Sequence, residues 1–203
     1  MIQATFKDAK GQTTRFETDA IGRVTKQIDP LTRTTTIQRD PQGNPITITR
    51  PNGAVTTMTY DAKGNLLTST EQAIAATTTF TYEPVFNQVT RITDPKGNQT
   101  NITYDAKGNP LTITDADNQV TTFTYNAQGL LLTTKDALNQ MTTFTYDALG
   151  RLLTTTDPLN RTTTLTYDTA GNVATSKDAL DRITTFQYDV KNRLMKKKNW
   201  GQA

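Results

Sequence analysis

One motif returns about every 21 residues through this chain, and that period constrains the fold more than any other feature. Tyr104-Asp-Ala-Lys-Gly108 is followed by Tyr146-Asp-Ala-Leu-Gly150 and by Tyr167-Asp-Thr-Ala-Gly171. Nine copies share one register, so the chain is an array whose units bury apolar residues against their neighbours. The acidic or amide residue of the motif stands, with gaps of 21 or 22 residues, at Asp19, Asp40, Asp61, Glu83, Asp105, Asn126, Asp147, Asp168 and Asp189.

A second motif lies half a period after the first. In both motifs Asp usually stands first, Ala or Pro follows, and Gly or Asn stands fourth. An Asp side chain caps a turn, Pro presets φ, and Gly or Asn accepts a positive φ. We therefore predict type I turns closed by a bulge residue, a common hairpin connection. The second motif begins at Asp8, Asp29, Arg50, Glu71, Asp94, Asp115, Asp136, Asp157 and Asp178.

The residues between the turns alternate in character. Thr142, Phe144 and Tyr146 fall on one face of an extended segment, whereas Thr143 and Thr145 fall on the other. Period two over five or six residues indicates a half-buried strand, and no segment shows a convincing helical period. Threonine, at 45 of 203 residues, favours strands and suits a wet sheet face. The sequence predicts an all-β repeat protein, a curved antiparallel β-meander of about 18 short strands.

Composition and charge exclude several classes of function. The chain has no Cys and no His, which removes thiol catalysis, zinc fingers and the commonest general base. A net charge of +3, mostly spread through turns, predicts no nucleic-acid partner. No apolar window is long enough to span a membrane and no signal-peptide pattern is present, so we expect no membrane insertion. We divide the chain into a repeat array over 1–195 and a basic non-repeat tail over 196–203.

The signature Tyr-Asp-x-x-Gly-Asn/Arg-Leu, followed by Thr-x-Asp-Pro-x-Gly/Asn, resembles the Rhs family, also called YD repeats. Its best copies begin at Tyr60, Tyr104, Tyr146 and Tyr167, and the Tyr82 copy resembles a variant unit that recurs in the family. The resemblance covers the entire chain. The structural repeat anchors are Tyr60, Asp61, Gly64, Tyr82, Tyr104, Asp105, Gly108, Tyr125, Gly129, Tyr146, Asp147, Gly150, Tyr167, Asp168, Gly171, Tyr188 and Asp189.

This resemblance implies a spiralling β-sheet that closes into a hollow shell, which in toxin members encloses a C-terminal toxic domain. Nothing in this chain matches the acidic segment that cuts the toxin free in those members. We therefore predict a non-catalytic structural segment of such a shell. Its expected partners are other YD-repeat segments or an enclosed toxin domain, and free sheet edges predict self-association. The family suggests a bacterial cell-surface or secreted setting.

Two other classes of function remain open from the residues alone. A cell-surface or carbohydrate-binding adhesion module would use one exposed Tyr per repeat to stack on sugar rings, whereas a structural ladder would also explain these tyrosines. The Asp-x-x-Gly-Asn loops resemble calcium repeats superficially, but they lack the alternating ligands of an EF-hand and a nine-residue period. Carboxylates placed one per turn favour turn capping over acid–base chemistry. We expect no metal, no cofactor and no catalytic residue.

Overall fold

The computed structural model describes residues 2–201, with Ile2 described by its backbone alone. The described chain is all-β and antiparallel, apart from one short 3-10 helix, η1 (Gln72–Ile74), which confirms the predicted fold class. It divides into two compact units, Met1–Asn101 and Ile102–Ala203. Nineteen strands are described, one more than the number expected from the sequence. The repeats contain eighteen connections, and eighteen connections join nineteen strands. No helix in this part of the chain is long and apolar enough to cross a membrane.

In the first unit each strand pairs with the next along the chain, from β1 to β9. β10 (Gln99–Tyr104) spans the boundary between the units, and its first residues pair with β9. The strands of the first unit are β1 (Ile2–Lys7), β2 (Thr13–Thr18), β3 (Val24–Ile28), β4 (Thr34–Arg39), β5 (Pro45–Thr49), β6 (Val55–Tyr60), β7 (Leu66–Glu71), β8 (Ala76–Tyr82) and β9 (Val89–Thr93).

The second unit repeats this consecutive pairing from β11 to β19. Lys196–Lys198 belong to β19, whereas the proposed domain boundary at residue 195 stays a prediction. The strands of the second unit are β11 (Pro110–Thr114), β12 (Val120–Tyr125), β13 (Leu131–Lys135), β14 (Met141–Tyr146), β15 (Leu152–Thr156), β16 (Thr162–Tyr167), β17 (Val173–Lys177), β18 (Ile183–Tyr188) and β19 (Leu194–Lys198).

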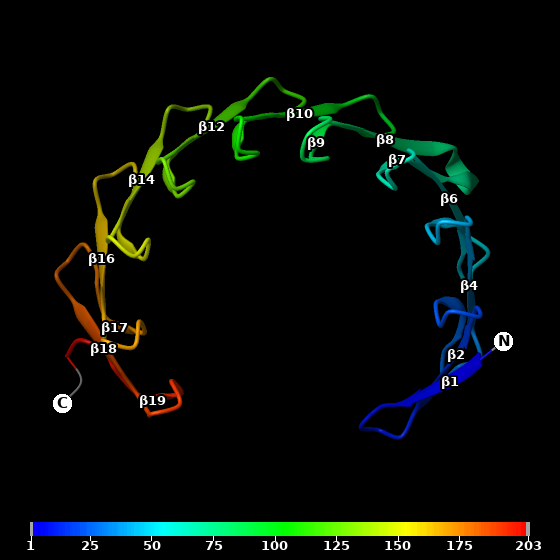
Figure 1. Ribbon diagram of the computed structural model, residues 1–203, viewed down its shortest axis with the longest axis horizontal. Helices are drawn as coiled ribbons and strands as arrows, with labels where there is room; N and C mark the ends of the chain where they lie inside the picture. Colours follow the sequence, from blue (N-terminus) through cyan, green and yellow to red (C-terminus); the bar gives the residue numbers. More distant parts are fainter. Residues whose placement is uncertain (1, 202–203) are drawn as a thin grey trace. The chain divides into compact units, whose positions relative to one another are not determined.

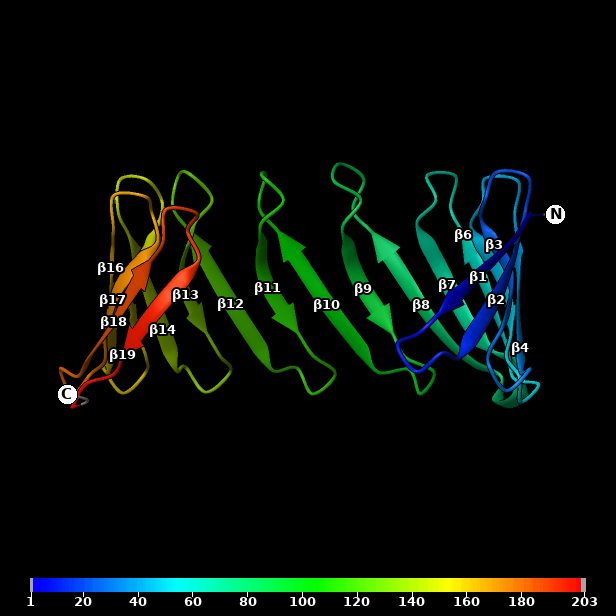
Figure 2. The same cartoon turned by 90° about the horizontal axis from the view of Figure 1, so that it is seen from below.

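The two kinds of turn lie at opposite ends of the strands in each unit, so each kind forms a row along one side of the sheet (Figure 2). We call the turns that follow the Tyr position, beginning at Asp19 and its equivalents, the YD turns, and their side the YD edge. The turns of the second motif, beginning at Asp8 and its equivalents, are the mid-repeat turns on the mid-repeat edge. This separation follows from alternating strand direction, because successive hairpins of a meander close at alternate ends.

Hairpins closed by YD turns contain a bulge, whereas the mid-repeat hairpins of the second unit keep a constant register. Across β14 and β15, Tyr146 pairs with Leu152 but Thr145 pairs with Thr154, so Leu153 is the additional residue. Across β13 and β14 the register does not shift. A bulge bends its strand and increases the local twist. Because the bulge recurs near the YD turns of successive hairpins, the sheet of each unit curves from one strand to the next (Figure 1).

In each unit the sheet is a single layer with two chemically different faces. Phe144 and Tyr146 lie on what we call the Tyr face, and Thr143 and Thr145 lie on the Thr face, as the alternation predicted. No hydrophobic side chain in the described chain is fully buried. On the Thr face, cross-strand hydroxyl pairs hydrogen-bond at 2.6–2.9 Å: Thr59–Thr68, Thr81–Thr90, Thr103–Thr112, Thr124–Thr133, Thr145–Thr154 and Thr166–Thr175.

Candidate functional site: the repeated tyrosine and turn unit

Each typical turn is closed by one carboxylate that serves several donors. Asp105 Oδ1 accepts the N–H groups of Lys107 and Asn109, both at 2.8 Å, and its Oδ2 accepts Asn109 Nδ2 at 2.9 Å. The Gly108 N–H donates to the Asp105 carbonyl at 3.1 Å, and Gly108 has a φ of 84°. This arrangement is a type I turn followed by a bulge residue with positive φ, as the sequence predicted.

Hydrogen bonds to the capping carboxylates favour their ionised form. The side-chain amide of Asn109 and its backbone N–H lower the pKa of Asp105 below its usual value, against the opposing effect of burial. The Arg161 guanidinium lowers the pKa of Asp157 in the same way, across an ion pair of 2.6 Å. Asn126 keeps the same cap with an amide oxygen, accepting the N–H groups of Gln128 and Leu130 at 3.0 and 2.9 Å.

The tyrosines join each repeat to the one before it. Tyr146 Oη donates to the Leu131 carbonyl at 2.8 Å, across 15 residues of sequence. Burial, together with the Asp105 carboxylate of the preceding YD turn, raises the pKa of Tyr125. The tyrosines are therefore half-buried structural residues. The equivalent bonds measure 2.7–2.9 Å and run from Tyr60 to Pro45, Tyr82 to Leu66, Tyr125 to Pro110 and Tyr167 to Leu152.

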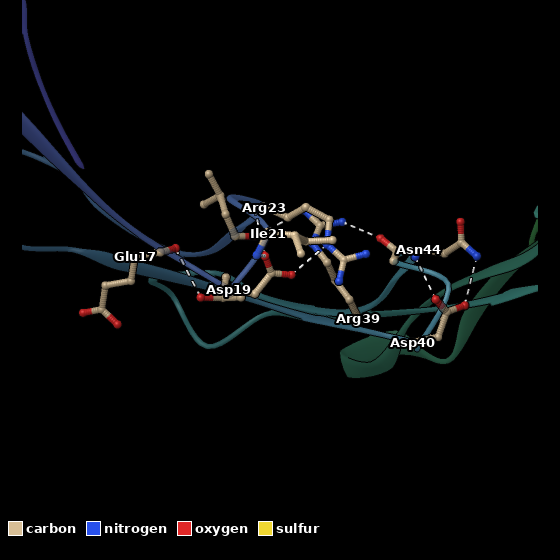
Figure 3. Close-up of polar contacts among 10 residues, drawn as sticks. Glu17, Asp19, Ile21, Arg23, Arg39, Asp40 and Asn44 are labelled. Carbon is tan, nitrogen blue, oxygen red and sulfur yellow. Dashed lines mark hydrogen bonds and ion pairs between the residues drawn. The ribbon is translucent and has the colours of Figure 1, made fainter. Parts of the chain in front are cut away.

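Arg39 occupies the Tyr position of its repeat and makes an equivalent contact with different chemistry. Its Nη2 donates to the Val24 carbonyl at 3.2 Å, again across 15 residues, and its Nη1 donates to the Gly43 carbonyl at 3.0 Å. It lies between the capped turns of Asp19 and Asp40 (Figure 3). The Tyr-Asp motif did not indicate Arg39, although its place directly before Asp40 in the repeat was the available signal.

The YD turns also contact one another through the fifth residue of each turn. Leu130 Cδ1 lies 3.3 Å from the position that a Cβ atom on Gly150 would take. The side chain from the preceding YD turn lies within 4 Å of this position at Gly43, Gly64, Gly129, Gly150 and Gly171. No such contact from another hairpin exists at the mid-repeat glycines Gly53 and Gly97. At many mid-repeat turns Asn, Asp or Thr takes the positive φ in place of Gly: Thr32, Asn118, Asn139, Asn160 and Asp181.

One repeat departs from the pattern at both of its connections. At the first, Glu71 does not cap its own turn; its Oε2 contacts Arg50 Nη1 at 3.3 Å and accepts from Thr56 Oγ1 at 3.0 Å. At the second, Glu83 caps a longer loop, and Lys63 from the preceding YD turn donates to the Pro84 carbonyl at 3.0 Å. These two connections account for the two 22-residue gaps.

The sequence-predicted anchors do not converge on a single centre. They form one Tyr–Asp–Gly set per repeat, and each set contacts its neighbours in the array. Within residues 2–201 no three Asp or Glu side chains gather as a metal-ligand group. The arrangement connects each repeat to its neighbour, and its capping carboxylates accept hydrogen bonds from donors in their own turns.

Comparisons with known proteins agree with this repeat geometry. The family model "Teneurin YD-shell" matches residues 1–163, and the model "RHS Repeat" matches residues 167–202. No curated protein sequence matches the chain.

Several solved structures share the fold, including the following three. A crystal structure of TcdB2-TccC3-TEV has 18% identity and a TM-score of 0.65, over 92% of this chain and 12% of that chain. TcdB2-TccC3 without its hypervariable C-terminal region gives 14% identity and a TM-score of 0.56, over 97% and 14% of the two chains. The Photorhabdus luminescens Tc holotoxin pore gives 16% and 0.56, over 96% and 14%.

The chain thus spans about one eighth of the length of the solved chains that it resembles. These matches concern the fold, because their identity is low. The family models, in contrast, cover most of the sequence in phase with the Tyr–Asp–Gly sets. The chain belongs to the teneurin YD-shell family, as a structural segment of a YD-repeat shell.

Proposed function

We propose that this chain is part of the wall of a shell that encloses a polypeptide domain, a toxin domain in the members that it resembles. The Tyr face is the proposed contact surface for the enclosed domain. The observation that carries this proposal is that each described unit is a single-layer sheet, whose apolar face has no second layer within residues 2–201. An apolar sheet face ordinarily packs on another layer of structure.

The composition of the two faces supports this orientation. Phe123, Phe144 and Leu165 recur on the Tyr face at successive repeats, next to the tyrosines. The Thr face has hydroxyl pairs at the equivalent positions, and hydroxyls remain compatible with water. Removing the Tyr face from water by contact with a polypeptide is therefore more favourable than removing the Thr face.

No observation favours carbohydrate binding over this function. Five tyrosine hydroxyls donate to backbone carbonyls, and the rings are half-buried within the sheet. The proposal assigns no catalytic role to any residue, and the absence of enzymatic activity stays a prediction.

A binding measurement with a non-native polypeptide tests the proposal. Fluorescently labelled, reduced and carboxymethylated α-lactalbumin is titrated with the chain, and anisotropy reports binding. The double variant Phe123→Thr and Phe144→Thr is expected to weaken binding at least tenfold. The control Thr124→Ser and Thr145→Ser, on the Thr face of the same strands, is expected to leave it unchanged. Absent binding, or equal loss in both variants, would reject the Tyr face as the contact surface.

A further inference from the structure

The mid-repeat edge of the second unit presents large apolar side chains at four consecutive turns. Leu138, Leu159 and Leu180 stand third in their turns with 74%, 72% and 71% of their surfaces exposed. Trp200, in the turn after β19, is 65% exposed. We call these four side chains the apolar row. The turn itself does not require them, since Asp117 holds the same third position one repeat earlier.

The two edges of this unit differ in how they are used. On the YD edge, neighbouring turns are linked: Lys107 Nζ donates to the Ala127 carbonyl, and Asn172 Nδ2 donates to Asn192 Oδ1 at 3.0 Å. On the mid-repeat edge, no described side-chain hydrogen bond joins the turns of Asp136, Asp157 and Asp178 to one another. The three leucines of the apolar row therefore lie on turn tips that are available for contact.

Opposite charges flank the apolar row. The turn before Leu138 carries Asp115 and Asp117, and both residues are exposed. The strand that leads to Trp200 ends in Lys196–Lys198, all exposed. The edge thus runs from an acidic end through four apolar side chains to a basic end.

We propose that this edge docks on the same edge of a second copy of the chain, in antiparallel order about a two-fold axis. That order sets Leu159 of the two copies against each other on the axis, and Leu138 of each copy against Leu180 of the other. It also brings the acidic end of each copy to the basic end of the other, whereas a parallel order would oppose like charges. A self-complementary patch of this kind is what a two-fold interface requires.

The matching period favours a second array over other occupants. The apolar side chains recur once per repeat, so another stretch of the same array presents its own at the same spacing. An anionic lipid surface would repel the Asp115–Asp117 end. The inference goes beyond the proposed function, because it concerns the mid-repeat edge and not the Tyr face.

The oligomeric state of the chain tests this docking. Light scattering with size-exclusion chromatography over a concentration series is expected to detect a dimer. The triple variant Leu138→Asn, Leu159→Asn and Leu180→Asn is expected to raise its dissociation constant at least tenfold. Asn suits the position, since Asn52 occupies it in another turn. The matched control is Leu149→Asn with Ile21→Asn, two third-position residues on the YD edge that are 79% and 74% exposed, and it is expected to change nothing.

Charge exchange tests the antiparallel order. Asp117→Lys is expected to weaken the dimer, and so is Lys196→Glu with Lys198→Glu. All three substitutions in one chain are expected to restore it, because the opposed charges are then reversed together. Failure of this restoration would exclude the antiparallel order.

Three outcomes would overturn the docking. A wild-type chain that stays monomeric would do so. An unchanged dimer in the Leu triple variant would also do so, because it would assign association to backbone pairing between outer strands of the sheet. The third is a monomer that sediments with phosphatidylserine vesicles and loses this binding in the triple variant. Polypeptide binding on the Tyr face is expected to survive the Leu substitutions, so each proposal can fail independently of the other.

Discussion

At the scale of single residues, Arg39 and Tyr60 occupy the same position of successive repeats and contact the same kind of acceptor. The Tyr60 hydroxyl donates to the Pro45 carbonyl at 2.8 Å, and the Arg39 guanidinium donates to Val24 at 3.2 Å. Arg39 adds a second bond, to the Gly43 carbonyl, while its Nε has no hydrogen-bond partner. The position therefore requires a donor that crosses to the preceding repeat, whichever side chain supplies it.

Two single substitutions at Arg39 test that requirement. Arg39→Leu removes both donors and is expected to destabilise the chain by about 1–3 kcal/mol, since half-buried carbonyls lose their partners. Arg39→Tyr restores the donor found in the other repeats and is expected to recover most of this loss. Urea unfolding curves give both values. Equal destabilisation by the two variants would contradict the equivalence of Arg39 and Tyr60.

Two glycines with similar backbone angles provide a second prediction. Gly43 and Gly53 have φ of 99° and 80°, so alanine is strained at either. A Cβ on Gly43 would lie 1.7 Å from Arg23 Nη1, whereas a Cβ on Gly53 has nothing within 4 Å. Gly43→Ala is expected to cost about 1 kcal/mol more than Gly53→Ala in urea unfolding, because Arg23 must leave its position. In an Arg23→Ala background the difference should disappear, and its persistence would exclude this contact as the cause.

At the scale of elements, the capped hairpin is the unit that responds to acid. Hydrogen bonds lower the pKa of Asp105 and Asp147 in the folded chain relative to the unfolded chain. Their stabilisation is complete above the unfolded pKa and is lost as the pH falls through the lower folded pKa. The sensitive range therefore begins near pH 4 and extends downward. Asn126 caps the hairpin between them with a group that does not titrate in this range.

Hydrogen exchange resolved by residue tests this difference. As the pH falls from about 5 to about 2, protection of the Gly108 and Gly150 amides is expected to decline, since their capping carboxylates become protonated. Protection of the Gly129 amide, in the Asn126 hairpin, is expected to persist further into acid after correction for the intrinsic exchange rate. Asn126→Asp should make Gly129 behave like its neighbours. Simultaneous loss at all three amides would point to global unfolding instead of local caps.

The sequence predicted the local part of these hairpins and missed the part that depends on neighbours. An Asp followed by Gly three residues later predicts its turn, because the cap is made within five residues. The two kinds of turn nevertheless appeared equivalent, since the constraint on Gly150 comes from Leu130 on the preceding YD turn. The role of Arg39 was missed because its side chain resembles Tyr only in the bond that it makes. The bulge at Leu153 depends on cross-strand register, which the residue pattern leaves open.

At the scale of the whole molecule, stability comes from contacts between adjacent strands and repeats. No described hydrophobic side chain is fully buried, so there is no central core to which distant repeats contribute. The Tyr bonds and the YD-turn contacts connect each repeat only with the one before it. Such an array behaves as a one-dimensional system in which stability is a sum over units and their interfaces. Removal of one whole repeat should therefore leave the remaining repeats intact.

Two internal deletions test this additivity against strand register. Deletion of 147–167 joins Tyr146 to Asp168 and restores a normal Tyr–Asp junction, so the shortened chain is expected to fold with the same far-UV circular dichroism per residue. Deletion of 147–156 joins Tyr146 to Asp157, whose turn is equally well formed locally. It removes a single strand, however, and sets Tyr146 of the Tyr face opposite Thr162 of the Thr face. Because side chains alternate along a strand, this junction exchanges the two faces for every later strand. The ten-residue deletion is expected to lose its cooperative thermal transition or to aggregate. Equal stability of the two deletions would mean that the turns alone, without the Tyr contacts between repeats, hold the array together.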